Sequence, residues 1–228
     1  LFALALDDVE IAQIAQAAEI NYAHVRVGIM DQMAASLADT GHMLFIDTRS
    51  LRRKLLALPV NASVIVIDSG VPRQLATSVY NQRRAECEEA ARLLGVTSLR
   101  DVNTPEAALR LRRPLAQRAH HVISENNRVL EAAGGVTAER FGALMNASHA
   151  SLRDDYEVSI GALDVLTEIM QRTPGVFGAR LTGAGFGGAC VALAETASRQ
   201  RAAELIMTEY QARGYIGKLV VPPPVATP

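Results

Sequence analysis

Apolar residues recur at helical spacing in several segments of the chain. Apolar positions 9, 12, 14, 15 and 18 follow the Asp7-Asp8 pair, and this pattern predicts a helix over residues 7–21 with an acidic first turn. Six further segments show a helical pattern, at residues 80–94, 105–111, 116–133, 138–150, 160–171 and 197–213. We expect Gly95 and the Gly134-Gly135 pair to end two of these helices, because glycine accepts the backbone conformation of a helix C-terminus.

Short runs of branched apolar residues predict strands between the helices. These runs lie at residues 43–46, 63–67, 178–181, 189–193 and 218–221. Residues 49–54 are polar and basic, so we expect a connection there. Strands and helices alternate without a regular repeat of strand, helix and parallel strand, which favours an α+β sandwich over a doubly wound sheet.

Composition excludes several classes of protein. With 228 residues, 49% of them hydrophobic, the chain can bury a sizeable core in one large or two small domains. Its 23 basic residues face 24 acidic ones, so no global positive field gathers nucleic acid or an anionic membrane. We find neither an apolar stretch of membrane-spanning length nor a secretion leader. Cys87 and Cys190 are too sparse for a disulfide framework or a metal motif, and we expect a cytoplasmic protein.

A glycine-rich segment, Gly183-Ala184-Gly185-Phe-Gly187-Gly188, lies between two predicted strands. Its glycines allow a sharp turn and bring backbone N–H groups close to an anion, so it is a candidate phosphate or substrate cradle. No helix opens directly after it and it lacks the Lys-Ser/Thr pair of a P-loop, so it is neither a dinucleotide fingerprint nor a P-loop. The alternative interpretation is a glycine-rich strand corner that binds nothing.

Two carboxylates in the first third of the chain are candidate site residues. Asp31 follows Gly28 at a predicted helix start, where the positive end of the helix dipole favours an ionised carboxylate that can accept a proton. Simple compensation of the helix dipole explains the same position. Glu19, twelve residues earlier, has the oxygen chemistry that Mg²⁺ prefers, although a solvated helix residue is the plainer interpretation.

Tyr80 opens a predicted helix and can stack on a sugar face or hydrogen-bond a hydroxyl. Downstream of it, Arg83 and Arg84 with Glu86, Glu88 and Glu89 are interpreted as charge pairs on a solvated helix face. Residues 148–157 combine a hydroxyl, an arginine and carboxylates in a predicted break between helices, where capping and ion pairing explain them. All five histidines are interpreted as structural: His24, His42, His120, His121 and His149.

Several of these segments resemble, in order and spacing, the galactokinases of the kinase superfamily that also holds homoserine, mevalonate and phosphomevalonate kinases. The resemblance rests on Gly28-Ile-Met-Asp31-Gln32 with its continuation at 41–51, on residues 78–90 around Tyr80, on residues 148–157, and on Arg180-Leu-Thr-Gly-Ala-Gly-Phe-Gly-Gly188. It covers nearly the whole chain, and these matches are far more specific than a lone glycine motif.

The resemblance implies a two-domain GHMP-kinase fold that lacks most of its N-terminal domain. Residues 1–58 would be the remnant of an N-terminal kinase domain similar to domain 2 of ribosomal protein S5. Residues 59–222 would form the C-terminal kinase domain, a ferredoxin-like α/β sandwich with extra helices. Residues 223–228 would be a Pro-rich tail.

The resemblance also implies an activity and a set of site residues. An intact galactokinase transfers the γ-phosphoryl group of MgATP to the anomeric hydroxyl of α-D-galactose, which gives galactose 1-phosphate for the Leloir pathway. Asp31 would accept the hydroxyl proton, and Gly28 and Tyr80 would bind the sugar with it. The glycine-rich segment would lie near phosphates and substrate, and Glu19 would bind Mg²⁺. The implied cofactors are ATP and Mg²⁺, and we expect a monomer with galactose and ATP as ligands and no nucleic-acid or membrane partner.

The chain also departs from the family pattern. Val27 and Ala189 stand where many relatives have Cys. Residues 68–73 differ from the more common Asn-Ser-Asn sequence at the expected rim of the sugar pocket. The family's sugar motif and its Gly/Ser-rich ATP loop are expected before Leu1, so we expect the 228 residues alone not to phosphorylate sugar. Two alternatives stay open: a non-catalytic galactokinase-like sensor of sugar and nucleotide, and a kinase for another hexose or a uronic acid.

Overall fold

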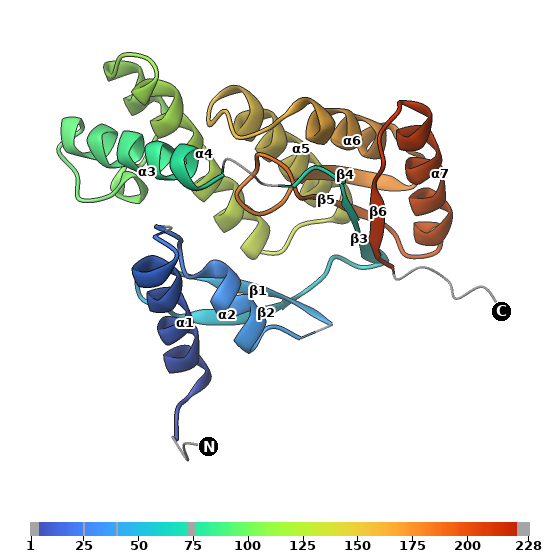
Figure 1. Ribbon diagram of the computed structural model, residues 1–228, viewed down its shortest axis with the longest axis horizontal. Helices are drawn as coiled ribbons and strands as arrows, with labels where there is room; N and C mark the ends of the chain where they lie inside the picture. Colours follow the sequence, from blue (N-terminus) through green and yellow to red (C-terminus); the bar gives the residue numbers. More distant parts are fainter. Residues whose placement is uncertain (1–4, 25, 40, 73–75, 223–228) are drawn as a thin grey trace. The chain divides into compact units, whose positions relative to one another are not determined.

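The computed structural model describes residues 5–24, 26–39, 41–72 and 76–222 (Figure 1). The Pro-rich tail expected at 223–228 therefore lies outside the described residues. The chain divides into two compact units, Leu1–Leu58 and Pro59–Pro228, here called the N unit and the C unit. The assignment of each unit to a particular kinase domain stays a prediction.

The N unit contains two helices and a hairpin. Helix α1 (Asp8–Tyr22) begins with a capping box, in which Glu10 N donates to Asp7 Oδ1 and Asp7 N donates to Glu10 Oε2, both at 2.8 Å. Helix α2 spans Met30–Leu37. Strands β1 (His42–Ile46) and β2 (Arg53–Ala57) pair antiparallel. The helix predicted at 7–21 and the helix start before Asp31 are confirmed.

The connection predicted at residues 49–54 is wrong at its end, because strand β2 begins at Arg53. Arg53 and Lys54 are the first two residues of β2 and pair with Ile46 and Phe45 of β1. Both basic side chains are exposed, and most of β2 faces solvent. A strand without a buried face has no alternation of apolar and polar residues, so its sequence pattern resembles a polar connection.

The C unit contains a four-stranded sheet of β3 (Ala62–Asp68), β4 (Val176–Leu181), β5 (Ala189–Glu195) and β6 (Lys218–Val221). The strand order is β4-β5-β3-β6, and every neighbouring pair is antiparallel. Helices connect β3 to β4 and β5 to β6, while β4 and β5 follow one another directly. This β-α-β-β-α-β order is ferredoxin-like, as the family resemblance implied, and it agrees with the α+β class predicted from the sequence pattern.

Five α-helices and two 3₁₀ segments complete the described part of the C unit. They are α3 (Ala76–Leu93), η1 (Leu99–Asp101), η2 (Pro105–Arg110), α4 (Leu115–Ala133), α5 (Ala138–Asp154), α6 (Gly161–Arg172) and α7 (Arg199–Ala212). Helices α5, α6 and α7 pack against the sheet, and α3 packs against α4 beside it (Figure 1). The sheet and these three helices enclose the main core, in which Ile65, Leu163, Leu166 and Tyr210 are fully buried.

Two helix predictions in the C unit are wrong in detail. Residues 105–111 form a 3₁₀ segment rather than an α-helix, with Leu111 N bonded to Ala108 O at 3.0 Å. The break between helices that was predicted at residues 148–157 begins only at Asp155, because helix α5 continues through Asp154. The polar residues of that stretch lie within the helix, and Ser148, His149 and Ser151 are buried. In the described part of the chain, no helix is long and apolar enough to cross a membrane.

Candidate functional site

The glycine-rich segment forms a corner between β4 and β5 with an unusual backbone. Four of its glycines and Phe186 have positive φ: Gly183 75°, Gly185 79°, Phe186 58°, Gly187 128° and Gly188 80°. Residues other than glycine rarely adopt a positive φ, because their Cβ atom then clashes with the backbone. The sharp turn predicted from the sequence is therefore present, and we call residues 183–188 the glycine-rich corner.

Neighbouring backbone holds the glycine-rich corner on two sides. Phe186 N donates to Val158 O at 2.8 Å, and Gly188 N donates to Val71 O at 2.9 Å. A Cβ atom on Gly185 would lie 2.2 Å from Val158 O, and one on Gly187 would lie 2.5 Å from Val71 O. Glycine at these two positions allows a close approach between backbones that another residue would prevent.

In the described part of the chain, three consecutive amides of the corner have no protein acceptor, although Gly185 itself is buried. Among the described residues, no acceptor is bonded to the N–H groups of Gly183, Ala184 or Gly185. Successive backbone N–H groups in a turn with left-handed residues form a typical anion-binding feature. The geometry thus suits the phosphate or substrate cradle predicted from the sequence.

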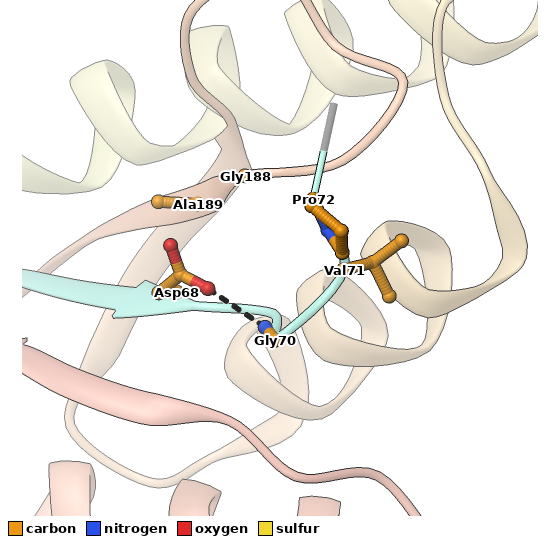
Figure 2. A pocket seen from close by; sticks show the side chains of 6 residues that line it. All are labelled: Asp68, Gly70, Val71, Pro72, Gly188 and Ala189. Carbon is orange, nitrogen blue, oxygen red and sulfur yellow. Dashed lines mark hydrogen bonds between the residues drawn. The ribbon is translucent and has the colours of Figure 1, made fainter. Parts of the chain in front are cut away.

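A shallow cavity of about 510 Å³, widely open to solvent, lies beside the corner at the ends of β3 and β5 (Figure 2). Its lining is Asp68, Gly70, Val71, Pro72, Gly188 and Ala189. Asp68 Oδ1 accepts from Gly70 N at 2.7 Å, which fixes the carboxylate at the cavity wall. The volume suits a small ligand. Sequence reasoning noted residues 68–73 only as a departure from the family, and that departure was the one signal for this cavity.

Tyr80 lies half-buried on α3 of the C unit. The helix begins at Ala76, so Tyr80 lies within it and does not open it as predicted. The prediction of a solvated charged face on this helix is wrong for Arg83, which is buried, and right for Arg84, whose exposed side chain pairs with Glu88 at 3.3 Å.

Asp31 lies in the first turn of α2 in the N unit, and its side chain is exposed. Among the described residues, no hydrogen bond or ion pair holds its carboxylate. Gly28 precedes the helix, and a Cβ atom there would meet nothing within 4 Å, so packing of the described residues does not require this glycine. An exposed carboxylate with no protein partner among the described residues can accept a proton from a ligand.

Glu19 and Gln32 form a polar contact between α1 and α2. Gln32 Nε2 donates to Glu19 Oε1 at 2.7 Å, and Gln32 is 8% exposed. Gln32 Oε1 is buried and has no hydrogen-bond partner in the described part of the chain. Sequence reasoning missed Gln32, because its neighbour Asp31 carries the recognisable chemistry.

A partly buried group of polar side chains supports the end of β4, just before the glycine-rich corner. Arg180 Nη1 and Ser148 Oγ donate to Glu125 Oε1 at 2.8 and 2.6 Å. Burial raises the pKa of Glu125, but the Arg180 guanidinium and the hydrogen bonds outweigh it, so the pKa lies below its usual range. His149 Nδ1 accepts from Leu181 N at 3.3 Å, and burial lowers the pKa of His149. A neutral His149 is the form that can accept this bond.

The predicted site residues thus divide between the two units. The glycine-rich corner, the cavity and Tyr80 belong to the C unit, whereas Asp31, Gly28 and Glu19 belong to the N unit. Within the described ranges, no three His, Cys, Asp or Glu side chains gather into a metal-binding group.

Comparisons with known proteins show which family the chain resembles. Residues 131–213 match the family model of the GHMP kinases C terminal. The galactokinase of Roseiflexus sp. strain RS-1 is 46% identical over 200 residues, which cover 83% of this chain and 51% of that protein. The galactokinase of Chloroflexus aurantiacus is 48% identical over 195 residues, which cover 81% of this chain and 50% of that protein. The chain is a homologue of galactokinases with a GHMP kinase C-terminal domain.

Solved structures agree with this assignment. The crystal structure of Lactococcus lactis galactokinase complexed with galactose matches with a TM-score of 0.87 at 33% identity, covering 96% of this chain and 60% of that one. The L. major mevalonate kinase in complex with R-mevalonate shares the fold, with a TM-score of 0.58 at 21% identity. The chain spans about half the length of the curated galactokinases it matches. The galactokinase resemblance and the predicted fold of the C-terminal domain are confirmed.

Proposed function

We propose that this chain is part of a galactokinase, which transfers the γ-phosphoryl group of MgATP to the anomeric hydroxyl of α-D-galactose. The observation that carries the proposal is Asp31, an exposed carboxylate without a bound partner among the described residues, in a chain 46–48% identical to curated galactokinases. The likeness to a galactokinase complexed with galactose supports the choice of sugar.

Each group of site residues has a role in the proposed reaction. Asp31 accepts the proton of the sugar hydroxyl as that oxygen attacks the γ-phosphorus, and the dipole of α2 favours its ionised form beforehand. Tyr80 stacks on the sugar or hydrogen-bonds one of its hydroxyls, and Gly28 lies at the sugar side of Asp31. The free amides of the glycine-rich corner bind the anionic part of the reactants. Phosphoryl transfer depends mainly on such positioning and charge stabilisation.

Mg²⁺ and ATP are the proposed cofactors. Mg²⁺ binds through one or two carboxylates together with phosphate oxygens, so the exposed Glu19 carboxylate has suitable chemistry and the buried Gln32 Oε1 offers a further oxygen nearby. Bound Mg²⁺ would neutralise phosphate charge. We expect Glu19→Gln to raise the Mg²⁺ concentration for half-maximal activity by about 10-fold or more, and an unchanged requirement would remove Glu19 from the site.

The protein is proposed to act in the cytoplasm as a monomer. Both cysteines are free thiols, with Cys190 buried and Cys87 half-buried, which supports a reducing location. Sedimentation at micromolar concentration tests the monomer, and a stable dimer would contradict it.

A substrate panel tests the proposed function. The polypeptide as its gene encodes it is incubated with MgATP and one of four sugars: galactose, glucose, mannose or galacturonic acid. The sugar 1-phosphates are then separated and quantified. We expect galactose 1-phosphate as the dominant product. Dominant phosphorylation of another sugar would identify a kinase of different specificity, and galactose binding without any transfer would identify a sensor.

The same assay applies to the isolated 228 residues, which we propose to be silent. ATP-dependent galactose 1-phosphate formation by this chain alone would contradict that part of the proposal.

A further inference from the structure

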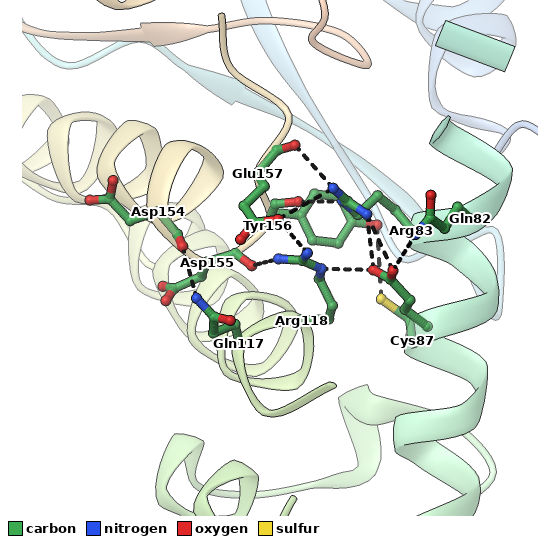
Figure 3. A network of polar contacts seen from close by, with 10 residues as sticks. Gln82, Arg83, Cys87, Gln117, Arg118, Asp154, Asp155, Tyr156 and Glu157 are labelled. Atoms are coloured by element: carbon green, nitrogen blue, oxygen red, sulfur yellow. Dashed lines mark hydrogen bonds and ion pairs between the residues drawn. The ribbon is translucent and has the colours of Figure 1, made fainter. Parts of the chain in front are cut away.

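Two buried arginines of the C unit hold one short stretch of backbone. Arg83 on α3 is 8% exposed and Arg118 on α4 is 2% exposed. They donate to three consecutive carbonyls: Arg118 Nη1 to Asp155 O, Arg83 Nε to Tyr156 O at 2.7 Å and Arg83 Nη2 to Glu157 O at 3.4 Å (Figure 3). These carbonyls directly follow the end of α5, outside its helical hydrogen bonds, so their partners must come from elsewhere.

Two glutamates balance the two positive charges. Glu86 Oε2 accepts from Arg118 Nε at 2.8 Å and from Arg83 Nη1 at 3.1 Å, and Glu157 Oε2 accepts from Arg118 Nη2 at 2.6 Å. We call Arg83, Glu86, Arg118 and Glu157 the Arg-Glu cluster. A planar guanidinium can donate in three fixed directions at once, and an ammonium cannot reproduce that geometry. The cluster therefore requires arginine for its shape as well as its charge.

The backbone held by the Arg-Glu cluster leads directly into the support of the glycine-rich corner. Val158 follows Glu157 and is 2% exposed. Val158 O accepts from Phe186 N at 2.8 Å, and the close approach of Gly185 leaves no room for even a methyl group against the same carbonyl. A shift of residues 155–157 is thus transmitted to the corner through a buried, tightly packed residue.

The Arg-Glu cluster also anchors the helix that carries Tyr80. Tyr80 and Arg83 are three residues apart on α3, so they lie on neighbouring positions of one helix face. The ring of Tyr156 lies between α3 and α4, where it stacks on His121 with centroids 4.5 Å apart and accepts a weak hydrogen bond from Cys87 Sγ at 3.9 Å. The same few residues therefore fix α3, α4 and the approach to the corner.

We propose that Arg83 and Arg118 are positioning residues that hold Tyr80 and the glycine-rich corner in a fixed relation through the carbonyls of residues 155–157. The inference rests on the proposed function where it says that Tyr80 and the corner bind substrates. The mechanical coupling between the cluster and the corner does not depend on that function and can be measured without catalysis.

Amide hydrogen exchange of the full-length protein tests the coupling. In Arg118→Lys we expect the Phe186 amide to exchange about 10-fold faster, while the amides of β5 keep their protection. The matched control is Arg92→Lys on α3, an exposed arginine paired with Glu89 at 2.7 Å, which should change neither. Unchanged exchange at Phe186 would overturn the proposal, and equal acceleration throughout β5 would reduce the cluster to a general stabilising role and overturn it as well.

A milder variant keeps the test decisive if Arg118→Lys fails to fold. Glu157→Gln retains the size of a side chain that is 49% exposed and removes one charge of the cluster. We expect about 3-fold faster exchange at Phe186 and no change in β5. Unchanged Phe186 exchange in this variant contradicts the proposal.

Kinetics separate this inference from the proposed function. In Arg118→Lys we expect the KM for the sugar to rise about 10-fold, because Tyr80 is displaced, and kcat to fall as well, because the corner positions the anionic part of the reactants. Arg92→Lys should change neither constant. If the wild-type protein phosphorylates no sugar but the exchange result holds, the proposed function fails and the coupling stands. If the wild-type protein is active and the Phe186 exchange does not respond, the coupling fails and the proposed function stands.

Discussion

The two units differ in how much apolar surface they bury. The main core of the C unit contains seventeen buried residues around its sheet, whereas the buried core of the described part of the N unit consists of Ala12, Ile29 and Met33. On α1 of the N unit, Ile11 and Ile14 are 46% and 55% exposed. Burial of apolar surface is the main favourable contribution to folding, so within these 228 residues the C unit should be more stable than the N unit.

This difference matters for the proposed reaction. The glycine-rich corner and Tyr80 belong to the strongly packed unit, while Asp31 belongs to the weakly packed one. Regions with few buried apolar contacts open at low free energy, and ligand-binding elements are often drawn from them. The comparison predicts that the proposed site residues of the C unit are held rigidly, whereas those of the N unit open readily.

Removal of a core side chain should have the largest effect. Leu166 is fully buried in the C unit, and Leu166→Ala should lower the free energy of unfolding of that unit by about 3–5 kcal/mol, through lost burial and the cavity left behind. Met33→Ala in the N unit should leave the main urea transition unchanged in circular dichroism. An equal shift of that transition by Met33→Ala would break the comparison.

Acid should destabilise the C unit through its buried histidines. Burial lowers the pKa of His121 to about 4 from its ordinary 6.5. The positive charges of Arg128 and Arg180 lower this pKa further, whereas the negative charges of Glu125 and Asp155 oppose the shift. The unfolded chain therefore takes up this proton first as the pH falls below 6.5, and stability decreases until about pH 4. The difference between 6.5 and about 4 corresponds to about 3 kcal/mol.

Urea unfolding between pH 7 and 4 checks this prediction. His121→Gln should flatten the dependence of stability on pH, because it removes the proton uptake. A wild-type slope in His121→Gln would contradict the assignment.

A close contact between helix and sheet gives a prediction of intermediate size. A Cβ atom on Gly142 of α5 would lie 2.1 Å from Phe177 O on β4, so Gly142→Ala must separate the two elements and should cost about 1–3 kcal/mol. Gly28→Ala in the N unit meets nothing within 4 Å and should change the melting temperature by less than a degree. Equal melting temperatures for both variants would show that the C unit is not packed as described.

A surface pair should have the smallest effect. Arg140 and Glu131 pair at 2.5 Å with side chains 55% and 41% exposed, and solvent screens such pairs. Arg140→Gln should lower the free energy of unfolding of the C unit by less than about 1 kcal/mol, measured by the same urea titration. A loss as large as that of Leu166→Ala would mean that surface charge, rather than core burial, separates the two units.

The sequence predicted local features better than long-range ones. The capping residue Asp7 and the turn at residues 183–188 depend on neighbouring residues, and both were predictable from residue type. The burial of Arg83 was not predictable, because its partners at Tyr156 and Glu157 lie more than seventy residues further along the chain. Strand β2 was partly missed, because an exposed strand has no buried face to impose a pattern.

The candidate site shows the same division. Asp31, Tyr80 and the glycine-rich corner were identified from motifs, whereas the cavity at Asp68 and the contact of Gln32 with Glu19 depend on which elements meet in the fold. Side chains that act through distant neighbours carry no signal in their own segment. The Arg-Glu cluster belongs to this group.

The proposed reaction depends most directly on the Asp31 carboxylate, and one kinetic comparison tests it. In the polypeptide as its gene encodes it, Asp31→Asn should lower kcat for galactose 1-phosphate formation by about 10²–10⁴-fold. Asp8→Asn, which changes an exposed aspartate in the first turn of α1, should retain wild-type kcat. Equal rates for Asp31→Asn and Asp8→Asn would contradict the account.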